Sequence, residues 1–268
     1  MSCDNEDAIP AYIQIDEYQI TANAATQGSN SHNIQDVWVY ANNNLIGAFN
    51  LPATIPILEE GSVDIIIDPG IRDNGISASP RIYPYYTRYE TTVELISEQV
   101  TAVTPSSTYT SDLKFVFKED FEESNIFSID RDMDNLTRMG QTSVGAIEGT
   151  AGVLDLSTAH PINEVATNIA YSNLPLTGSV DVYLELNYKA DVDFAIGLIG
   201  YDDFGAIQVF YSHVLTAKGE WNKAYLNFTE VLFNSRMNSY QVAFLAGLPD
   251  GLSEAKVLVD NVKLVHRE

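Results

Sequence analysis

Alternation of apolar and polar residues in many short segments is the feature that most constrains how this chain can fold. The stretches YIQIDEYQITA (12–22) and SVDVYLELNYKA (179–190) show it. A period of two places the apolar side chains on one face of a β-strand. Turn-forming pairs such as Pro69-Gly70 and Asn74-Gly75 separate the segments. The pattern predicts an all-β protein.

The first half of the chain reads as a series of short strands broken by Pro and Gly. Strand signals occur at 36–41, 62–68 and 91–97 in addition to 12–22. We expect a small antiparallel β-sandwich of about seven strands over residues 11–104. The stretch TPSSTYTSD that follows is rich in Ser, Thr and Pro, so residues 105–112 are predicted to be a linker.

The second half carries longer strands. Alternating segments follow one another from residue 113 to residue 268, and turns with Gly, Asp or Asn separate them. No helical segment stands between them as a crossover. Eight to ten strands of this kind favour a two-sheet jelly roll over 113–268.

Acidic residues dominate the charged composition. The formal net charge is −23, from 37 Asp and Glu against 14 Lys and Arg. An excess of this size repels phosphate backbones, so it excludes nucleic acid as a partner. It also disfavours binding to an anionic lipid surface through a basic patch. No run of about 18 apolar residues is present, so no transmembrane helix is expected.

The single cysteine lies close to the start of the sequence, and acidic residues follow it. One interpretation of Cys3 is an incidental thiol on a frayed terminus. The other is lipidation, because Met1-Ser2-Cys3 resembles the end of a bacterial lipobox, although the preceding apolar stretch is absent from the sequence. The following CDNED resembles the acidic signal of surface-exposed lipoproteins of Bacteroidetes-type bacteria. This resemblance implies a lipid-anchored acidic tether over 1–10 and a location on the cell-surface side of the outer membrane.

Three stretches of the second half resemble a known domain type. FKEDFEE (117–123), GEWNKAYLNFTE (219–230) and VLVDNVKLV (257–265) stand at its start, middle and end. They are similar to the jelly-roll domains grouped with galactose-binding and carbohydrate-binding modules. The first half, around residues 36–70, looks like an immunoglobulin-like or transthyretin-like sandwich.

The resemblance also implies a metal site. Domains of this kind often hold a structural Ca²⁺ between their first and last strands. Asp120, Glu122 and Asp260 are the residues at matching positions. The ion would pin the ends of the chain together and would take no part in chemistry.

A second acidic segment is a calcium candidate by its spacing alone. SIDRDMDNLT places Asp130, Asp132 and Asp134 at alternate positions, where carboxylates on a loop can converge on one Ca²⁺. It departs from an EF-hand loop because Asn135 stands where Gly is expected and Gln141 where the bidentate Glu would be. The alternative is a solvent-facing acidic turn.

The segment PRIYPYYTRY (80–89) is the candidate contact surface. Pro80 and Pro84 confine it to an edge or a loop. Tyrosine and arginine are enriched at interface hot spots, which favours a surface for a protein partner or a glycan. The alternative is a loop packed against its own sandwich. The surface would consist of Arg81, Tyr83, Tyr85, Tyr86, Arg88 and Tyr89.

Catalytic patterns are missing from the sequence. It contains no G-x-S-x-G elbow, and its four histidines are far apart. The adjacent Asp202 and Asp203 are expected in a solvated loop, since neighbours on a strand face opposite ways. Trp221 is expected in the core. We therefore predict a protein without enzymatic activity.

Three functions remain open at this stage. The first is a cell-surface lipoprotein that acts as a binding or assembly subunit of an outer-membrane protein complex, with a β-barrel protein as its partner. The alternative is a glycan-binding surface lipoprotein of a polysaccharide-uptake system. The third is a glycan-active enzyme. Co-purification with a barrel protein, retardation in polysaccharide gels and turnover of glycans, respectively, would distinguish them.

Overall fold

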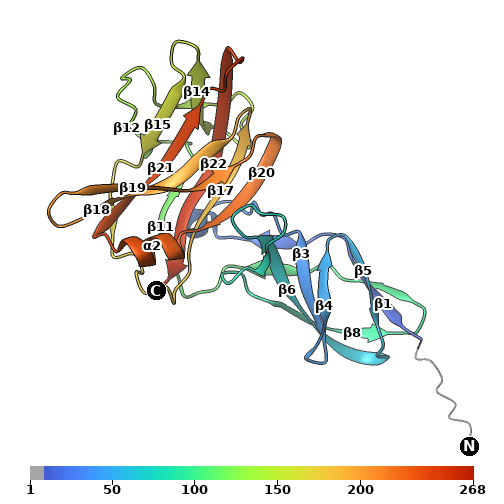
Figure 1. Cartoon of the computed structure of the whole chain (residues 1–268). Coiled ribbons are helices and arrows are strands. Elements are labelled where there is room, and N and C mark those ends of the chain that lie inside the picture. Colours follow the sequence, from blue (N-terminus) through green and yellow to red (C-terminus); the bar gives the residue numbers. More distant parts are fainter. Residues whose placement is uncertain (1–8) are drawn as a thin grey trace, which may run out of the picture. The chain divides into compact units, whose positions relative to one another are not determined.

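The computed structural model describes residues 9–268, and strands make up most of it (Figure 1). The chain divides into two compact units. The first contains residues 9–22, 32–72 and 76–111, and the second contains residues 23–31, 73–75 and 112–268. The all-β fold class is confirmed. Cys3 and most of the predicted tether lie outside the described residues.

The first unit is a small β-sandwich as predicted, but it has ten strands where about seven were expected, and the pairs β1–β9 and β2–β10 are parallel. β3, β4, β6, β7 and β8 form one sheet, while β5-β1-β9 and β10-β2 form two smaller sheets. Ile13 and Val39, from different sheets, are fully buried, as the alternation predicts. The strands are β1 (Ala11–Ile15), β2 (Gln19–Thr21), β3 (Asp36–Ala41), β4 (Asn44–Asn50), β5 (Ala53–Ile57), β6 (Gly61–Arg72), β7 (Pro80–Ile82), β8 (Tyr89–Leu95), β9 (Val100–Ala102) and β10 (Ser106–Thr108).

The structure differs from the predicted linker at 105–112. Residues of this segment form β10, which pairs with β2 in parallel. The hydroxyl groups of Tyr18 and Ser107 lie 2.6 Å apart, and both side chains are buried. Only the central residue of each strand, Ile20 and Ser107, is buried, and the hydroxyl of Ser107 finds a hydrogen-bond partner there.

The second unit contains two short helices and the remaining strands. Most of its strands are longer than those of the first unit. Its elements are α1 (Ala24–Gln27), β11 (Leu113–Glu119), β12 (Ile129–Asp130), β13 (Met139–Thr142), β14 (Ala151–Ser157), β15 (Ile162–Ala166), β16 (Tyr171–Ser172), β17 (Val182–Ala190), β18 (Phe194–Tyr201), β19 (Ile207–Leu215), β20 (Lys218–Asn227), α2 (Thr229–Ser235), β21 (Ser239–Gly247) and β22 (Glu254–Arg267).

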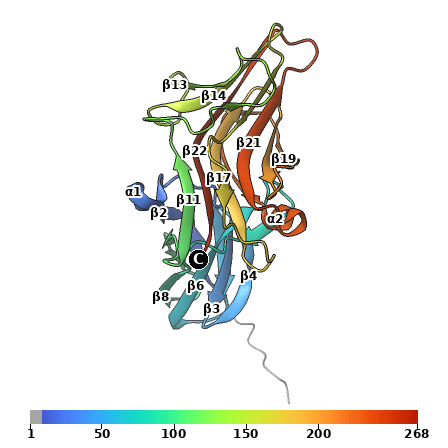
Figure 2. The same cartoon turned by 90° about the vertical axis from the view of Figure 1, so that its left-hand side faces the viewer.

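Two six-stranded sheets form this unit. The first has the order β13-β14-β22-β17-β20, with β11 also on β22; the second has the order β12-β15-β21-β18-β19, with β16 also on β21. Consecutive long strands switch between the sheets, apart from the β18–β19 hairpin. This alternation is the topology of a jelly roll. Figure 2 shows β22 and β17 in one layer and β21 and β19 in the other.

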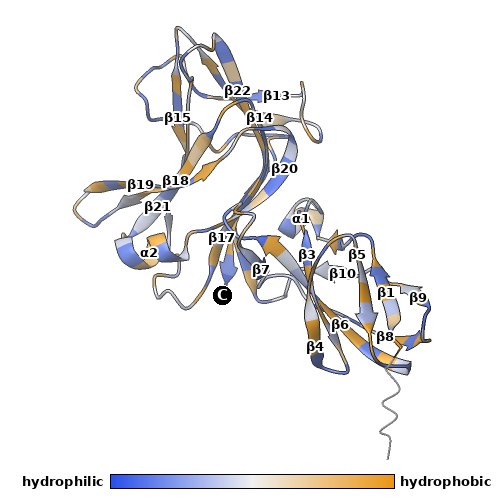
Figure 3. Ribbon diagram, turned by 45° about the vertical axis from the view of Figure 1, so that its right-hand side comes forward, coloured by the Kyte–Doolittle hydropathy of each residue, from blue (hydrophilic) through white to orange (hydrophobic). Residues whose placement is uncertain are grey.

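Side chains from both sheets fill the space between them. Leu184 and Leu264 come from the first sheet, and Val242 and Phe244 from the second; each is at most 1% exposed. Hydrophobic and hydrophilic residues alternate along the strands (Figure 3). The described residues include no helix long and apolar enough to cross a membrane.

The polar segment 23–31 packs within the second unit. The Asn23 side chain caps α1 by accepting hydrogen bonds from Ala25 N and Thr26 N. Lys263 Nζ donates to Gln27 O at 2.7 Å, and Lys263 is only 1% exposed. Burial, and then the neighbouring Lys223, lowers the pKa of the Lys263 ammonium to about 7. The segment thus supplies a carbonyl oxygen to a buried amine.

Candidate functional site

The outer face of the β12-β15-β21-β18-β19 sheet carries the residues of greatest functional interest. Phe194, Ile196 and Leu198 of β18 point into the core, so the intervening residues point outward. Two outward tyrosines, Tyr201 on β18 and Tyr211 on β19, pack on this face. We call the following set the tyrosine face: Arg131, Glu164, Tyr201, Tyr211 and Gln241.

Tyr211 lies across the sheet. Its Oη donates to Glu164 Oε1 at 2.7 Å. Tyr211 belongs to the edge strand β19 and Glu164 to β15, with β18 and β21 between them. Three strand spacings amount to about 14 Å, so the phenol ring has to lie over the two intervening strands to reach the carboxylate. The ring therefore lies against the outer surface of the sheet, across the strands, and it is partly exposed to solvent.

Small residues make this posture possible. The residue paired with Tyr211 on β18 is Gly197, and Gly197 itself pairs with Ala243 and then Ala166 on the next strands. A Cβ atom on Gly197 would meet Phe210 O at 2.3 Å, so no side chain fits there. Ala166 and Ala243 are fully buried beneath the tyrosines. Small side chains on these strands thus leave room for the Tyr211 ring to pack flat against the sheet.

Tyr201 is held in a similar way. Its Oη donates to Oε1 of Gln241 on the neighbouring strand, and Gln241 Nε2 donates to Thr167 O. Thr167 in turn bonds to β21 through Val242 N, 3.2 Å from its Oγ1. The hydrogen bonds fix the tyrosine hydroxyl, while the ring packs against the cluster that contains Ile199. The two aromatic rings of this face therefore have restricted positions before any ligand arrives.

Charged groups border the Tyr211 ring. Burial is the main cause that raises the pKa of the Tyr211 hydroxyl, and the hydrogen bond and negative charge of Glu164 add to it. The positive charge of Arg131 acts in the opposite direction. Arg131 Nε is buried and has no hydrogen-bond partner within residues 9–268. A buried donor without a partner costs free energy, so this edge of the tyrosine face is an energetically unfavourable place in the fold.

A second site of interest is an acidic cavity in the same unit. Its volume is about 180 Å³, and the segment 24–29, the end of β11 and the middle of β22 contribute to it. Asp120, Glu122 and Asp260, which the resemblance implied as calcium ligands, all line it together with Glu148. The structure therefore brings the three residues to one place.

Asp260 has an unusual environment in this cavity. It is 2% exposed, and its Oδ1 accepts a hydrogen bond from Asn261 N at 2.6 Å. Burial is the main cause that raises the pKa of its carboxyl to about 7, and the charges of Glu148, Glu122 and Asp120 contribute. Asn261 takes a positive φ of 50°, which any residue other than Gly, Asn or Asp rarely adopts. The backbone of β22 therefore departs from a regular strand at Asn261, next to Asp260 in the acidic cavity.

The carboxylates of the cavity already have protein partners. Glu148 Oε1 accepts from Ser29 Oγ at 3.0 Å, and Glu122 Oε1 accepts from Thr150 N at 2.8 Å. Within residues 9–268, no three His, Cys, Asp or Glu side chains are grouped so that they could hold a metal ion. Oxygen atoms that suit Ca²⁺ therefore line the cavity without forming a ready ligand set. The calcium prediction stays a prediction.

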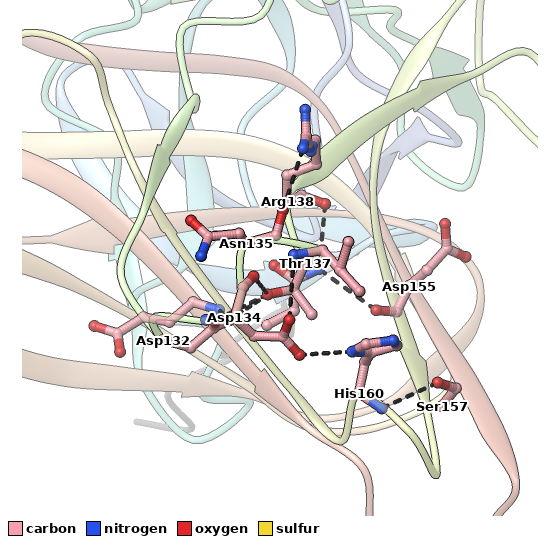
Figure 4. Close-up of polar contacts among 11 residues, drawn as sticks. Asp132, Asp134, Asn135, Thr137, Arg138, Asp155, Ser157 and His160 are labelled. Atoms are coloured by element: carbon pink, nitrogen blue, oxygen red, sulfur yellow. Dashed lines mark hydrogen bonds and ion pairs between the residues drawn. The ribbon is translucent and has the colours of Figure 1, made fainter.

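The acidic run at 130–135 is bonded internally (Figure 4). Asp132 accepts hydrogen bonds from Asp134 N, Thr137 Oγ1 and Glu164 N. Asp134 Oδ2 lies 2.6 Å from His160 Nδ1, and this interaction lowers the pKa of the Asp134 carboxyl. Asp130 belongs to β12. Asp132 and Asp134 thus hold the loop to the β14–β15 connection.

The Tyr/Arg segment does not form the predicted contact surface at most of its tyrosines. Tyr83, Tyr85 and Tyr86 are 1%, 1% and 5% exposed. Their rings contact one another, with centroids 5.4 Å apart for Tyr83 and Tyr85 and 4.8 Å for Tyr83 and Tyr86. The rings pack edge to face because this removes their apolar area from water. The alternative of a loop packed on its own sandwich describes them.

The other members of that segment are more accessible. Arg88 pairs with Asp68 at 3.0 Å, while its side chain stays 50% exposed. Tyr89 begins β8, and both Tyr89 and Arg81 are half-buried. Arg81 lies on β7 and Tyr89 on β8, and Arg88 directly precedes β8.

Two smaller expectations have clear outcomes. Asp202 and Asp203 lie in the turn between β18 and β19, as expected, and Asp202 Oδ1 accepts from Phe204 N and Ala206 N. Trp221 was expected in the core, but it is half-buried and its Nε1 donates to Gly145 O at 2.8 Å. Ala224 of the same strand points into the core, and Trp221 lies three residues before it, so the alternation of the strand turns the Trp221 side chain outward.

Sequence reasoning missed the tyrosine face. The segments DFAIGLIGYDD and SYQVAFLAG read as ordinary strands because their outward residues Ile199 and Ala243 are as apolar as core residues. One signal was available. The outward positions 195, 197, 199 and 201 carry no charge and end in tyrosine, which is unusual for a face that contacts water.

Comparisons with known proteins identify no family model and no curated protein that matches the chain. Among solved structures, a family 22 xylan-binding domain from Paenibacillus barcinonensis is similar at 14% identity and a TM-score of 0.42, covering 59% of this chain and 98% of the other. A family 30 carbohydrate-binding module of a Clostridium thermocellum cellulase has 14% identity and a TM-score of 0.43, with 57% and 96% covered. A family 11 module from the same organism, in complex with a β-1,3-1,4-mixed-linked tetrasaccharide, has 14% identity and a TM-score of 0.36, with 55% and 93% covered. Because these values are low, the fold assignment rests on the strand order above.

Proposed function

We propose that the second unit binds a glycan on the tyrosine face and that the protein acts by binding. The observation that carries this proposal is the posture of Tyr211, whose ring lies along the sheet with its hydroxyl bonded to Glu164. A sugar ring has an apolar face of C–H groups that packs well on the face of an aromatic ring. A tyrosine already held in position loses little conformational entropy when a ligand stacks on it.

Polar groups around the rings suit the hydroxyls of a sugar. Glu164 can accept hydrogen bonds beside Tyr211, and Gln241 can accept or donate beside Tyr201. An array of donors and acceptors beside a stacking surface gives orientation to the ligand. None of these residues forms a nucleophile paired with a base. The carboxylate of Glu164 accepts a hydrogen bond from Tyr211 and so serves to hold the ring. We therefore propose binding without bond cleavage.

The glycan-binding alternative is favoured over a role as a subunit of an outer-membrane assembly. The assembly hypothesis used the Tyr/Arg segment as one of its supports, and Tyr83, Tyr85 and Tyr86 are buried, so this segment offers little contact surface to a protein partner or to a glycan. The tyrosine face, in contrast, is on the outside of a sheet and contains two partly exposed aromatic rings. A partner protein remains a hypothesis that co-purification from detergent-solubilised membranes would test.

Affinity electrophoresis of the full chain tests the proposal. The gels would contain xylan, mixed-linkage β-glucan or mannan as neutral polymers, and polygalacturonate as an acidic one. We expect retardation by at least one neutral polymer, and loss of that retardation in Tyr211→Ala. Tyr86→Phe, altered in the first unit, is the matched control and should migrate like the wild type. Migration unaffected by every polymer would contradict the proposal.

We also propose that the acidic cavity binds one Ca²⁺ with a structural role. The support is the meeting of Asp120, Glu122 and Asp260 with Glu148 in one cavity, where burial first and then the charges of the neighbouring acids raise the pKa of Asp260. An ion bound only by the folded state stabilises it by mass action, by about 2.7 kcal/mol at a hundredfold excess over Kd. Melting in EDTA and in Ca²⁺ tests this. Equal melting temperatures would refute it.

The pH dependence without calcium gives a second test of the cavity. The folded pKa of Asp260, about 7, is above its value of 3.8 in an unfolded chain. Between these values the folded state holds the extra proton, so this group makes stability fall as pH rises from about 4 to about 7. Asp260→Asn should remove this contribution. A variant with the wild-type slope would show that Asp260 is solvated.

Location at the cell surface remains a proposal based on Cys3 and the acids after it. The support is the lipobox-like Met1-Ser2-Cys3 and the acidic signal, both outside residues 9–268. Metabolic labelling with a lipid analogue, with Cys3→Ala as the control, would test it. An unlabelled wild-type protein would refute the anchor.

A further inference from the structure

The turn of the β18–β19 hairpin holds a phenylalanine almost entirely in water. Phe204 is 95% exposed. Burying a side chain of this size stabilises a protein by about 2 kcal/mol, so a fully exposed position forgoes that gain. In Figure 1 the hairpin projects from the side of its unit with this turn at the outer end.

The turn is well defined. The Asp202 carboxylate accepts from Phe204 N at 2.8 Å and from Ala206 N at 2.7 Å, and Asp202 N donates to Ala206 O. Gly205 has a φ of +80°, which allows the chain to reverse. Asp203 accepts a hydrogen bond from Asn238 Nδ2. The backbone that carries the phenylalanine is thus fixed by five neighbouring residues.

Phe204 continues the line of aromatic residues on the same hairpin. Tyr211 pairs with Gly197, and Tyr201 lies four residues further along β18 towards the turn, or about 13 Å. Phe204 follows three residues after Tyr201, at the turn itself. The three aromatic residues therefore succeed one another along the hairpin from its base to its tip. A single sugar ring is too short to touch both tyrosines.

Exposed apolar side chains accompany this line. Ile207 and Val209 of β19 share the outward face with Tyr211 by register and are 50% and 47% exposed. Residues 194–215 contain Asp202 and Asp203 but neither Lys nor Arg. An anionic polymer or lipid would be repelled here, whereas an uncharged chain with apolar ring faces would not.

We infer that Phe204 is a distal stacking residue and that the ligand is an uncharged polysaccharide chain lying lengthwise along the β18–β19 hairpin, from Tyr211 past Tyr201 to the turn. This inference rests on the proposed glycan binding. A chain in this orientation contacts the tyrosine face with its middle and Phe204 with a sugar further along. Affinity should therefore increase with ligand length until the chain reaches the turn.

Titration with oligosaccharides of increasing length tests this inference. The probe is the oligosaccharide series of whichever neutral polymer retards the wild type, and the variants are Phe204→Ala and Phe204→Tyr in the full chain. We expect Phe204→Ala to bind the longest oligosaccharides about tenfold more weakly, which corresponds to the loss of one stacked ring. Its affinity for the shortest oligosaccharides that bind should equal that of the wild type. Phe204→Tyr should retain the wild-type values.

Controls separate this inference from its premise. Val144→Ala changes another exposed apolar side chain, 81% exposed, between β13 and β14, and should change nothing. Equal affinities of wild type and Phe204→Ala at every length would overturn the inference and leave the proposed function intact. A loss of equal size at every length would also overturn it, because the role would then be structural. Failure of the wild type to bind any neutral polymer would overturn both.

Discussion

The chain contains two groups of tyrosines that have opposite environments. Tyr83, Tyr85 and Tyr86 of the first unit pack ring against ring and are at most 5% exposed. Tyr201 and Tyr211 of the second unit lie on an outer sheet face, with their hydroxyls bonded to Gln241 and Glu164. The first group removes its rings from water, and the second leaves its rings partly exposed on the sheet. Residue type alone therefore does not identify a binding surface.

The largest effect should come from removing a buried ring. Tyr86→Ala deletes contacts with Tyr83 and with Tyr109, whose ring centroid is 4.9 Å away. Loss of a large buried aromatic side chain costs about 3–5 kcal/mol, so the first unit should unfold at much lower denaturant concentration. Glycan binding should stay unchanged. A loss below about 1 kcal/mol would show that the first group is not a packed core.

Removing a ring of the second group should affect binding instead. Tyr211→Ala should weaken binding of the neutral polymer about thirtyfold, in the range of a hot-spot residue of about 2 kcal/mol. Its unfolding free energy should fall by less than that of Tyr86→Ala, because the ring is only half-buried. If Tyr211→Ala destabilised the protein as much as Tyr86→Ala, the distinction between the two groups would fail.

Alkaline titration examines the hydroxyl of Tyr211. Burial and Glu164 hold its folded pKa above the unfolded value of about 10, so the folded state keeps the proton longer. Stability from this group is present below pH 10 and is lost as pH rises further through the folded pKa. The ultraviolet titration of wild type minus that of Tyr211→Phe should show one tyrosine that ionises later than a model tyrosine. A normal midpoint would mean that the ring is solvated.

The smallest effect should come from the hydrogen-bond partner. Glu164→Gln keeps an acceptor for the Tyr211 hydroxyl and removes a charge. We expect binding to change less than threefold, which corresponds to under about 0.7 kcal/mol. Glu164→Ala removes the acceptor and should weaken binding more than Glu164→Gln does. Equal losses in the two variants would show that the ligand needs the charge of Glu164 and that ring position is unimportant.

The sequence predicted the fold well because strand alternation is local. Residues 179–190 form most of β17 with its apolar side chains inward, as their spacing requires. The turn at Asp202 was also predictable, since Asp, Gly and small residues favour reversal. The prediction of a linker at 105–112 was wrong because a serine such as Ser107 can be buried in a short strand when its hydroxyl is hydrogen-bonded.

The tyrosine face was harder to predict for a physical reason. Alternation tells which residues of a strand share a side, but not which side another layer covers. Ile199 and Leu198 of β18 are equally buried, one under tyrosines and one in the core. The posture of Tyr211 depends on Gly197 and Glu164, which lie on other strands and far away in sequence. Only the paired sheet brings them together.

The membership of residues 23–31 in the second unit has a practical consequence. A fragment that begins at Asp112 would lack Gln27, whose carbonyl oxygen accepts a hydrogen bond from the buried ammonium of Lys263. It would also lack Ser29, whose hydroxyl donates a hydrogen bond to Glu148. Expression of the jelly roll by itself would thus leave an interior ammonium without this acceptor. No single cut of the polypeptide separates its two folded parts cleanly.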